Sequence, residues 1–202
     1  MKKILLLAVL ALALPTAVFA GSSVDFTNSG GILMGSSSGM SLTGSTLIAV
    51  QGLNGGGLIT GNDLGTVSFQ TGAPLTGSWQ HGGTFAGGGF FTITGNGTDG
   101  VPSGTLFTGS FSAPVTWTLV TLANGTHNYT LTGALTGTNA NGYSTVGVTV
   151  QLTINTGKGY FNGSTTISSG DTNIVVPEPG SLSLLGTGLI GLAGVVRRKL
   201  KA

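Results

Sequence analysis

The chain has 202 residues, including 38 glycines and no cysteine, so disulfide bonds and thiolate chemistry are excluded. Its formal net charge is +2 at pH 7, but six of its seven basic side chains lie within the first three or the last six residues. Between residues 21 and 176 one lysine, Lys158, stands against four aspartates. This acidic balance removes the electrostatic basis for nucleic-acid binding.

The N-terminus has the layout of a secretory signal peptide. Lys2 and Lys3 precede an apolar run over residues 4–14, and small side chains occupy the −3 and −1 positions of a cleavage site between Ala20 and Gly21. The alternative is a retained N-terminal anchor, which the short run and its small-residue exit disfavour. We therefore expect residues 1–20 to direct the chain to the secretion machinery and then to be removed.

Residues 21–175 are expected to form one Gly/Thr-rich β domain. Apolar residues alternate with threonine and other polar residues, which is the period of a half-buried strand. The alternation covers 67–69, 91–93, 115–119, 129–135 and 146–154, and a shorter apolar run covers 47–50. Asn124-Gly125 and residues 139–142 supply turn residues between the last three stretches, so hairpins are predicted there.

The fold class follows from this period. No part of the domain shows apolar residues at helical spacing, so we expect an all-β domain of about eight to twelve antiparallel strands with essentially no helix. An antiparallel β-sandwich or jelly-roll-like domain is the favoured architecture. The alternative is a solenoid, but the Thr-Gly pairs recur along the chain without a fixed period.

Side chains that could carry chemistry are few. His81 and His127 are the only histidines, and both are interpreted as exposed residues of a loop or strand edge because neither has a partner at metal-binding spacing. The aspartates stand beside turn-forming residues, where they favour local hydrogen bonds. These aspartates are Asp25, Asp63, Asp99 and Asp171. We predict no enzyme, metal or cofactor; a hydrolase stays open only if the fold gathers a histidine with two carboxylates.

Two segments match catalytic or nucleotide-binding motifs in a formal sense. Residues 35–39 fit G-x-S-x-G and residues 95–100 fit G-x-G-x-x-G, but no helical pattern follows either of them. In a chain this rich in glycine and serine we interpret both as chance matches, and the second as a hairpin loop.

The two tryptophans lead to different predictions. Trp117 is in register with Val115 and Leu119 and is predicted to lie in the core. Trp79 stands in a polar, Gly-rich segment without apolar alternation, so it is either packed or exposed. An exposed indole can stack on a sugar ring, and Trp79 is therefore the candidate sugar contact.

The C-terminal segment, residues 176–202, combines a rigid motif, an apolar stretch and a basic end. Pro177 and Pro179 favour an extended backbone around Glu178, the only glutamate of the chain. Residues 182–196 are uncharged and apolar all round, which favours a transmembrane helix over an amphipathic or core helix. Such a helix is about 22 Å long, shorter than the roughly 30 Å hydrocarbon core. The basic stop consists of Arg197, Arg198 and Lys199.

These residues resemble the PEP-CTERM sorting signal of Gram-negative bacteria, and the resemblance is limited to the last 26 residues. It implies that a membrane-embedded exosortase recognises Pro177, Glu178 and Pro179, cuts near them and removes the helix. It also implies an association with extracellular polysaccharide and biofilm matrix. The signal is shared by unrelated domains, so it implies nothing about the fold or chemistry of residues 21–175.

Together these features predict an exported, non-catalytic surface or extracellular-matrix protein. The C-terminal helix would anchor it transiently or permanently in the inner membrane, and its final location would be the cell surface or the matrix. The alternative is a carbohydrate-binding or adhesion module. The expected partners are the secretion machinery, the exosortase and the inner membrane, with exopolysaccharide as a candidate ligand and no nucleic acid.

Overall fold

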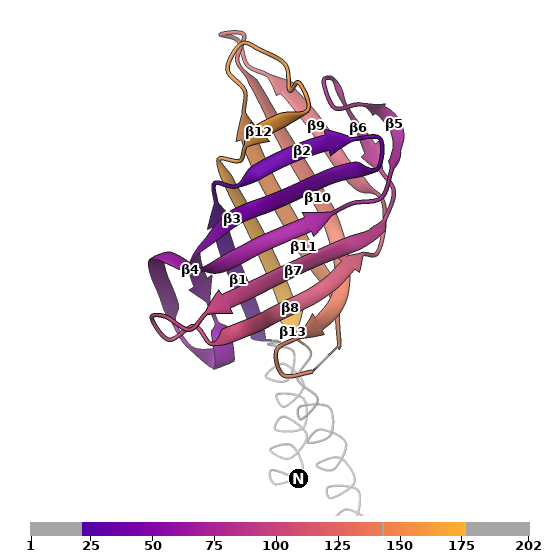
Figure 1. Ribbon diagram of the computed structural model, residues 1–202. Coiled ribbons are helices and arrows are strands. Elements are labelled where there is room, and N and C mark those ends of the chain that lie inside the picture. The colour runs from indigo at the N-terminus through magenta and orange to yellow at the C-terminus, as the bar shows by residue number, and fades with distance from the viewer. Residues whose placement is uncertain (1–21, 143, 177–202) are drawn as a thin grey trace, which may run out of the picture. The chain divides into compact units, whose positions relative to one another are not determined.

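The computed structural model describes residues 22–142 and 144–176 (Figure 1). The predicted signal peptide with its cut between Ala20 and Gly21, and the C-terminal sorting motif, helix and basic stop, lie outside these residues. Within the two described ranges, no helix has the length and apolarity that a membrane crossing requires. Residues 23–175 form one compact unit.

The described residues form thirteen strands and one short 3-10 turn at Leu53–Gly55. The strands are β1 (Ser22–Ser29), β2 (Ile32–Ser36), β3 (Gly39–Gln51), β4 (Leu58–Gln70), β5 (Pro74–Ser78), β6 (Gly82–Phe85), β7 (Gly88–Asn96), β8 (Ser103–Phe111), β9 (Val115–Thr121), β10 (His127–Asn139), β11 (Ser144–Asn155), β12 (Ser164–Thr166) and β13 (Ser169–Val176). This exceeds the predicted range of strand numbers, because short strands such as β6 (Gly-Gly-Thr-Phe) have too few side chains to show an alternating pattern.

The prediction of an all-β antiparallel domain is confirmed, and the two layers belong to one continuous sheet. In hydrogen-bonding order the strands run β11-β13-β1-β3-β4-β7-β8-β10-β9-β6-β5, and β10 also pairs with β11, so that the sheet closes on itself. Figure 1 shows β2, β3, β4, β7 and β8 as a front layer that crosses β1, β13, β11, β10 and β9 behind it. The layers face each other as in the predicted sandwich.

The closure depends on β10, which changes partner along its length. Residues 127–132 pair with β9, whereas residues 135–139 pair with β8, and β11 accompanies both halves on the other side. The half that pairs with β8 joins the two layers. The other half extends the back layer through β9 and β6 to β5, which has no further neighbour within the described sheet.

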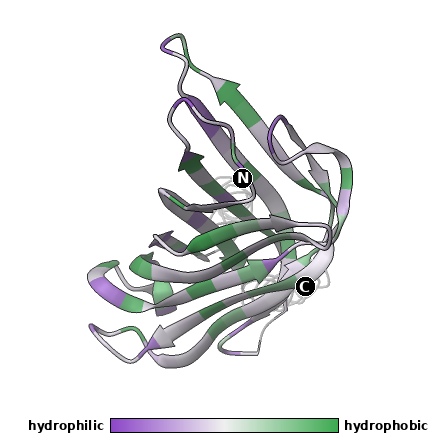
Figure 2. Ribbon diagram, turned by 45° about the horizontal axis from the view of Figure 1, so that its top comes forward, coloured by the Kyte–Doolittle hydropathy of each residue, from purple (hydrophilic) through white to green (hydrophobic). Residues whose placement is uncertain are grey.

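The space between the layers is filled by apolar side chains. Figure 2 shows hydrophobic residues alternating with polar residues along the strands, as the period-two pattern predicts. Phe69 and Phe91 stack with ring centroids 5.8 Å apart, and Phe111 meets both rings edge-on at 5.7 and 6.1 Å. All three are buried, and each such ring contributes roughly 1.5–3 kcal/mol to folding.

Glycine permits the closest strand contacts. Gly65 in β4 has a φ of +149°, a conformation that side chains with a Cβ rarely adopt. A Cβ at this position would overlap the carbonyl oxygen of Thr94 in β7. One of the two register shifts between β3 and β4 lies between Thr60 and Gly65 of β4, so the glycine lets a bent strand keep its pairing.

Candidate functional site

Buried aromatic side chains hold the segment 79–81, which joins β5 to β6 at the end of the back layer. The indole Nε1 of Trp117 donates to the carbonyl oxygen of Trp79 at 2.8 Å. The hydroxyl of Tyr129 donates to the carbonyl oxygen of Gln80 at 2.6 Å and accepts from the backbone N–H of Phe161 at 3.1 Å. Burial raises the pKa of the Tyr129 phenol, which therefore stays neutral and keeps donating. Trp117 is 1% exposed, which confirms its predicted place in the core.

Trp79 itself is half-buried. Its ring lies nearly parallel to that of Phe85, with centroids 6.3 Å apart, and its Cε3 would lie 3.2 Å from a Cβ at Gly35 in β2. Trp79 also lines a hollow of about 300 Å³ with Pro74, Thr76, Gly77, Ser78 and Phe85. One part of the indole thus packs against the sheet while the residue still borders an opening, so the predicted sugar contact stays a prediction.

The fold brings the two histidines to the same tyrosine. The ring centroids of His127 and Tyr160 are 4.3 Å apart, and those of His81 and Tyr160 are 5.0 Å apart. His81 is exposed, as predicted, but the prediction of an exposed His127 was wrong: it is 7% exposed. The Tyr160 ring stacks on the His127 ring, and Nδ1 of His127 lies 2.9 Å from the hydroxyl of Thr121. Nowhere in residues 22–142 and 144–176 do three metal-ligating side chains gather.

The aspartates were predicted to lie in turns or at termini with local hydrogen bonds, and this holds in part: Asp63 Oδ1 accepts from the backbone N–H of Gly65 at 3.2 Å. Only Asp99 lies in a turn, with a φ of +52°, whereas Asp63 lies in β4. Asp25 and Asp171 lie in the neighbouring strands β1 and β13. Both side chains are on the outer surface, because the residues next to them in each strand, such as Phe26 and Thr172, are buried. Sequence reasoning missed this pair because the partners are far apart in the chain.

The two carboxyl groups affect each other. Burial, and then the charge and hydrogen bonding of Asp171, raise the pKa of Asp25 above its ordinary value of 3.8, against a smaller lowering by Asn173. Asp25 Oδ1 is buried without a hydrogen-bond partner. The hydroxyl of Thr27 donates to Asp171 Oδ1 at 3.3 Å. No histidine lines the hollow beside Asp171.

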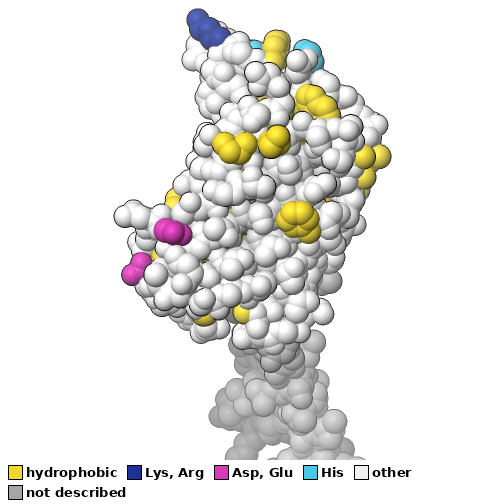
Figure 3. All heavy atoms as spheres, in the orientation of Figure 1, with side chains coloured by type: hydrophobic (Ala, Val, Ile, Leu, Met, Phe, Trp, Pro, Cys, Tyr) yellow, Lys and Arg dark blue, Asp and Glu magenta, His cyan; other side chains and the backbone are white. Residues whose placement is uncertain are grey.

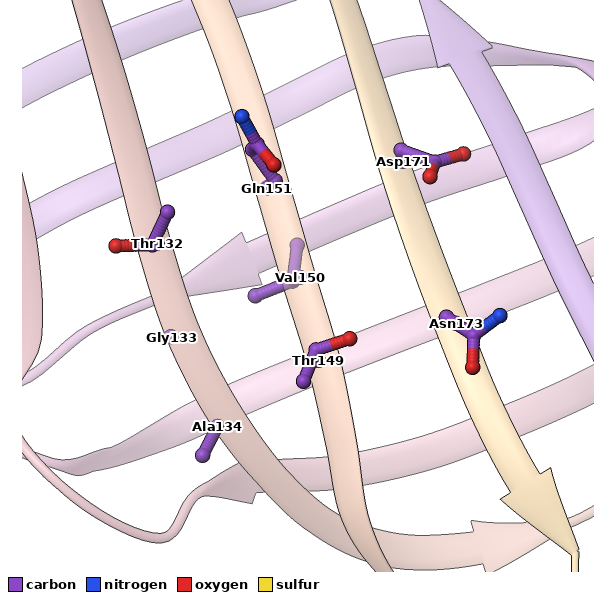
Figure 4. A pocket seen from close by; sticks show the side chains of 8 residues that line it. All are labelled: Thr132, Gly133, Ala134, Thr149, Val150, Gln151, Asp171 and Asn173. Carbon is purple, nitrogen blue, oxygen red and sulfur yellow. The ribbon is translucent and has the colours of Figure 1, made fainter.

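This second hollow, of about 410 Å³, lies on the outer face of the back layer (Figure 4). Three neighbouring strands line it: β10 with Thr132, Gly133 and Ala134, β11 with Thr149, Val150 and Gln151, and β13 with Asp171 and Asn173. Figure 4 shows Gln151 over β11, and Asp171 and Asn173 on β13 with their polar ends on the side of that strand away from β11. Nothing in the sequence marked these residues beyond their alternation with buried neighbours.

The outer surface of the front layer has a different character. In Figure 3 hydrophobic side chains appear as separate spots on a mostly uncharged surface over the front layer. The formal motif at residues 35–39 is the β2–β3 turn, and no helix follows it. Residues 95–100 belong to the end of β7 and the loop before β8, as the hairpin interpretation predicted.

Comparison with known proteins identifies one segment. Residues 175–199 match the family model of the PEP-CTERM protein-sorting motif, which confirms the resemblance seen in the sequence. The match indicates export, membrane-associated sorting and processing by an exosortase. Neither a curated protein nor a solved structure matches the chain.

Proposed function

We propose that this chain is a non-catalytic surface or extracellular-matrix protein, delivered through its sorting motif and built around a polar β domain. The observation that carries the proposal is the match of residues 175–199 to the PEP-CTERM motif. The resemblance links such proteins to polysaccharide-rich matrix, and the mostly uncharged surface of the domain suits an environment of that kind.

The distribution of reactive side chains supports a role without catalysis. His81 and His127 pack against Tyr160, whereas the carboxyl pair Asp25 and Asp171 lies on β1 and β13. Acid–base catalysis needs such groups within reach of one substrate. In the described residues the larger hollow offers one aspartate of that pair and no histidine.

The sorting part of the proposal is tested with Glu178→Ala. We expect this variant to stay in the membrane fraction at its unprocessed length, while the wild-type protein is released or transferred to the surface. The matched control is Asp99→Asn, which also removes one carboxylate but lies in a turn of the β domain and should be processed normally. Normal release of Glu178→Ala, measured by fractionation and immunoblotting, would contradict the proposal.

A second candidate function is carbohydrate binding at Trp79. The specific observation in its favour is the hollow bordered by Trp79 and Phe85, because aromatic rings give sugars an apolar surface on which to stack. Binding on a glycan array should be lost in Trp79→Ala and kept in Phe90→Ala, which removes a ring that is 44% exposed in β7. Equal binding of wild type and Trp79→Ala would remove Trp79 from the candidate site.

A further inference from the structure

A continuous row of polar side chains crosses the outer face of the back layer. Residues that are directly paired across antiparallel strands point to the same face, and their Cβ atoms lie roughly 4.5–5.5 Å apart. The registers therefore join six residues, one from each of six strands. The row consists of Thr76, Thr84, Thr116, Thr132, Gln151 and Asp171.

Two further rows flank it at the alternate positions of the same strands, about 6.7 Å away along each strand. On one side lie Thr118, Thr130, Thr153 and Ser169, and on the other side lie Ala134, Thr149 and Asn173. The residues between the rows, such as Trp117, Leu131 and Leu152, are buried in the core. The face is therefore a two-dimensional array of hydroxyl and amide groups.

The array is hollowed where the small residues Gly133 and Ala134 lie beside longer polar side chains. The hollow of about 410 Å³ forms where Ala134 leaves space between Thr132, Thr149 and Gln151, and Asp171 and Asn173 border it on β13. Its volume is within the usual range for small-molecule sites, roughly 300–1,000 Å³. No aromatic or large exposed apolar side chain lines it.

The chemistry of the hollow favours a ligand that carries many hydroxyl groups and no charge. Gln151 and Asn173 both donate and accept, the threonine hydroxyls do the same, and Asp171 accepts. Asp171 has Asp25 beside it, and no cation lines the hollow, so an anionic ligand would meet repulsion. The one lysine of the domain, Lys158, lies in the segment between β11 and β12, away from the lining strand positions.

We propose that this outer face binds a neutral polysaccharide, with one sugar unit in the hollow of Gln151, Asp171 and Asn173 and the chain continuing along the threonine row. Sugar hydroxyls donate to Asp171 and exchange hydrogen bonds with Gln151 and Asn173, while Thr132 and Thr116 contact the next unit. The proposal deepens the proposed function, on which it rests, by naming the ligand class of the exported protein. The hollow of Gln151, Asp171 and Asn173 is not the one that Trp79 lines, although Thr76 at the far end of the row borders the Trp79 hollow.

The test is affinity electrophoresis of the full-length protein, purified in mild detergent, through native gels that contain dextran, galactomannan or hydroxyethyl cellulose. We expect retardation in at least one neutral gel and none in a gel that contains alginate, which is anionic. The double variant Thr132→Val/Gln151→Met keeps the size of both side chains but removes their hydrogen-bonding groups. It should weaken binding about tenfold, since each lost hydrogen bond typically costs a factor of about two to ten.

The matched control is Thr92→Val/Thr108→Val, which changes a directly paired polar couple on the front layer and should bind like wild type. Ala134→Leu, which fills the hollow, should also weaken binding while melting at the wild-type temperature. The proposal is overturned if wild type passes all neutral gels unretarded, if the front-layer control loses binding equally, or if only Trp79→Ala abolishes binding. A dimer that Ala134→Leu dissociates in light scattering would also overturn it, because a second copy would then cover the face.

Sorting and binding can fail separately. Release of Glu178→Ala is scored in cells, whereas retardation is scored with purified protein. Normal release of Glu178→Ala would contradict the proposed function but would not affect the result of the gel experiment. Absence of retardation in the gels would contradict polysaccharide binding but would not affect the proposed sorting.

Discussion

Residues 175–199 match a family model, whereas residues 23–175 form a compact closed sheet and the chain matches neither a curated protein nor a solved structure. Under the proposed function an exosortase recognises the first segment as a short motif, which would require particular side chains such as Glu178. The sheet requires only apolar residues at alternate positions and glycine at close approaches, as at Gly65. Many sequences satisfy those conditions. The comparison teaches that a sorting address can be recognised where the delivered domain cannot.

If the two parts are independent, damage to one should leave the other intact. The largest effect is expected for deletion of residues 197–201, which removes the basic stop. Processing should be lost altogether, since the membrane orientation of the segment depends on these charges. The β domain should keep its wild-type melting temperature. Unchanged release of the deletion variant in fractionation experiments would contradict a requirement for the basic stop in processing.

The converse experiment changes the core and leaves the motif untouched. Trp117→Ala removes a buried ring that stacks on Tyr129 with centroids 4.9 Å apart and donates to Trp79. Loss of a buried aromatic typically costs about 3–5 kcal/mol, a large share of a domain's stability. We expect a strongly lowered urea midpoint but normal cutting of any chain that reaches the exosortase. A wild-type midpoint would mean that the aromatic cluster does not hold the domain together.

A smaller effect is expected for Tyr129→Phe. The change leaves the ring in place but removes the partner of the Gln80 carbonyl and of the Phe161 N–H. An unpaired buried polar group costs about 1–3 kcal/mol. Thermal unfolding below pH 10 should therefore occur at a lower temperature than in wild type. Tyr160→Phe is the control, because Tyr160 is 49% exposed and should tolerate the change.

The smallest effect concerns the carboxyl pair. The raised pKa of Asp25 means that the folded domain holds a proton that the unfolded chain releases, so this group favours folding below pH 3.8 and loses that contribution as pH rises through the raised value. Asp25→Asn should therefore raise the melting temperature at pH 7 relative to wild type and have less effect at pH 4. Asp63→Asn serves as the control. A larger gain at pH 4 than at pH 7 would contradict the assignment.

The alternation of apolar and threonine residues was enough to predict the long strands, the hairpin turns and the buried Trp117. Strand order was not predictable, because hydrogen bonds such as that between Thr27 and Asp171 join residues 144 positions apart and leave no local pattern. The same reason explains why the pairing of Asp25 with Asp171 and the burial of His127 were missed. The hollow on the outer face depends on registers among three strands, which the sequence does not display.

The position of β13 has a consequence for incomplete chains. This strand lies between β11 and β1, and Pro177 of the sorting motif is the residue that follows it. A product that stops before residue 169 leaves both neighbouring strands with unpaired backbone groups, which promote aggregation. The same product also lacks Pro177, Glu178 and Pro179. A truncation before residue 169 therefore removes both the strand that completes the sheet and the motif that directs sorting, so such a product is neither correctly folded nor sorted.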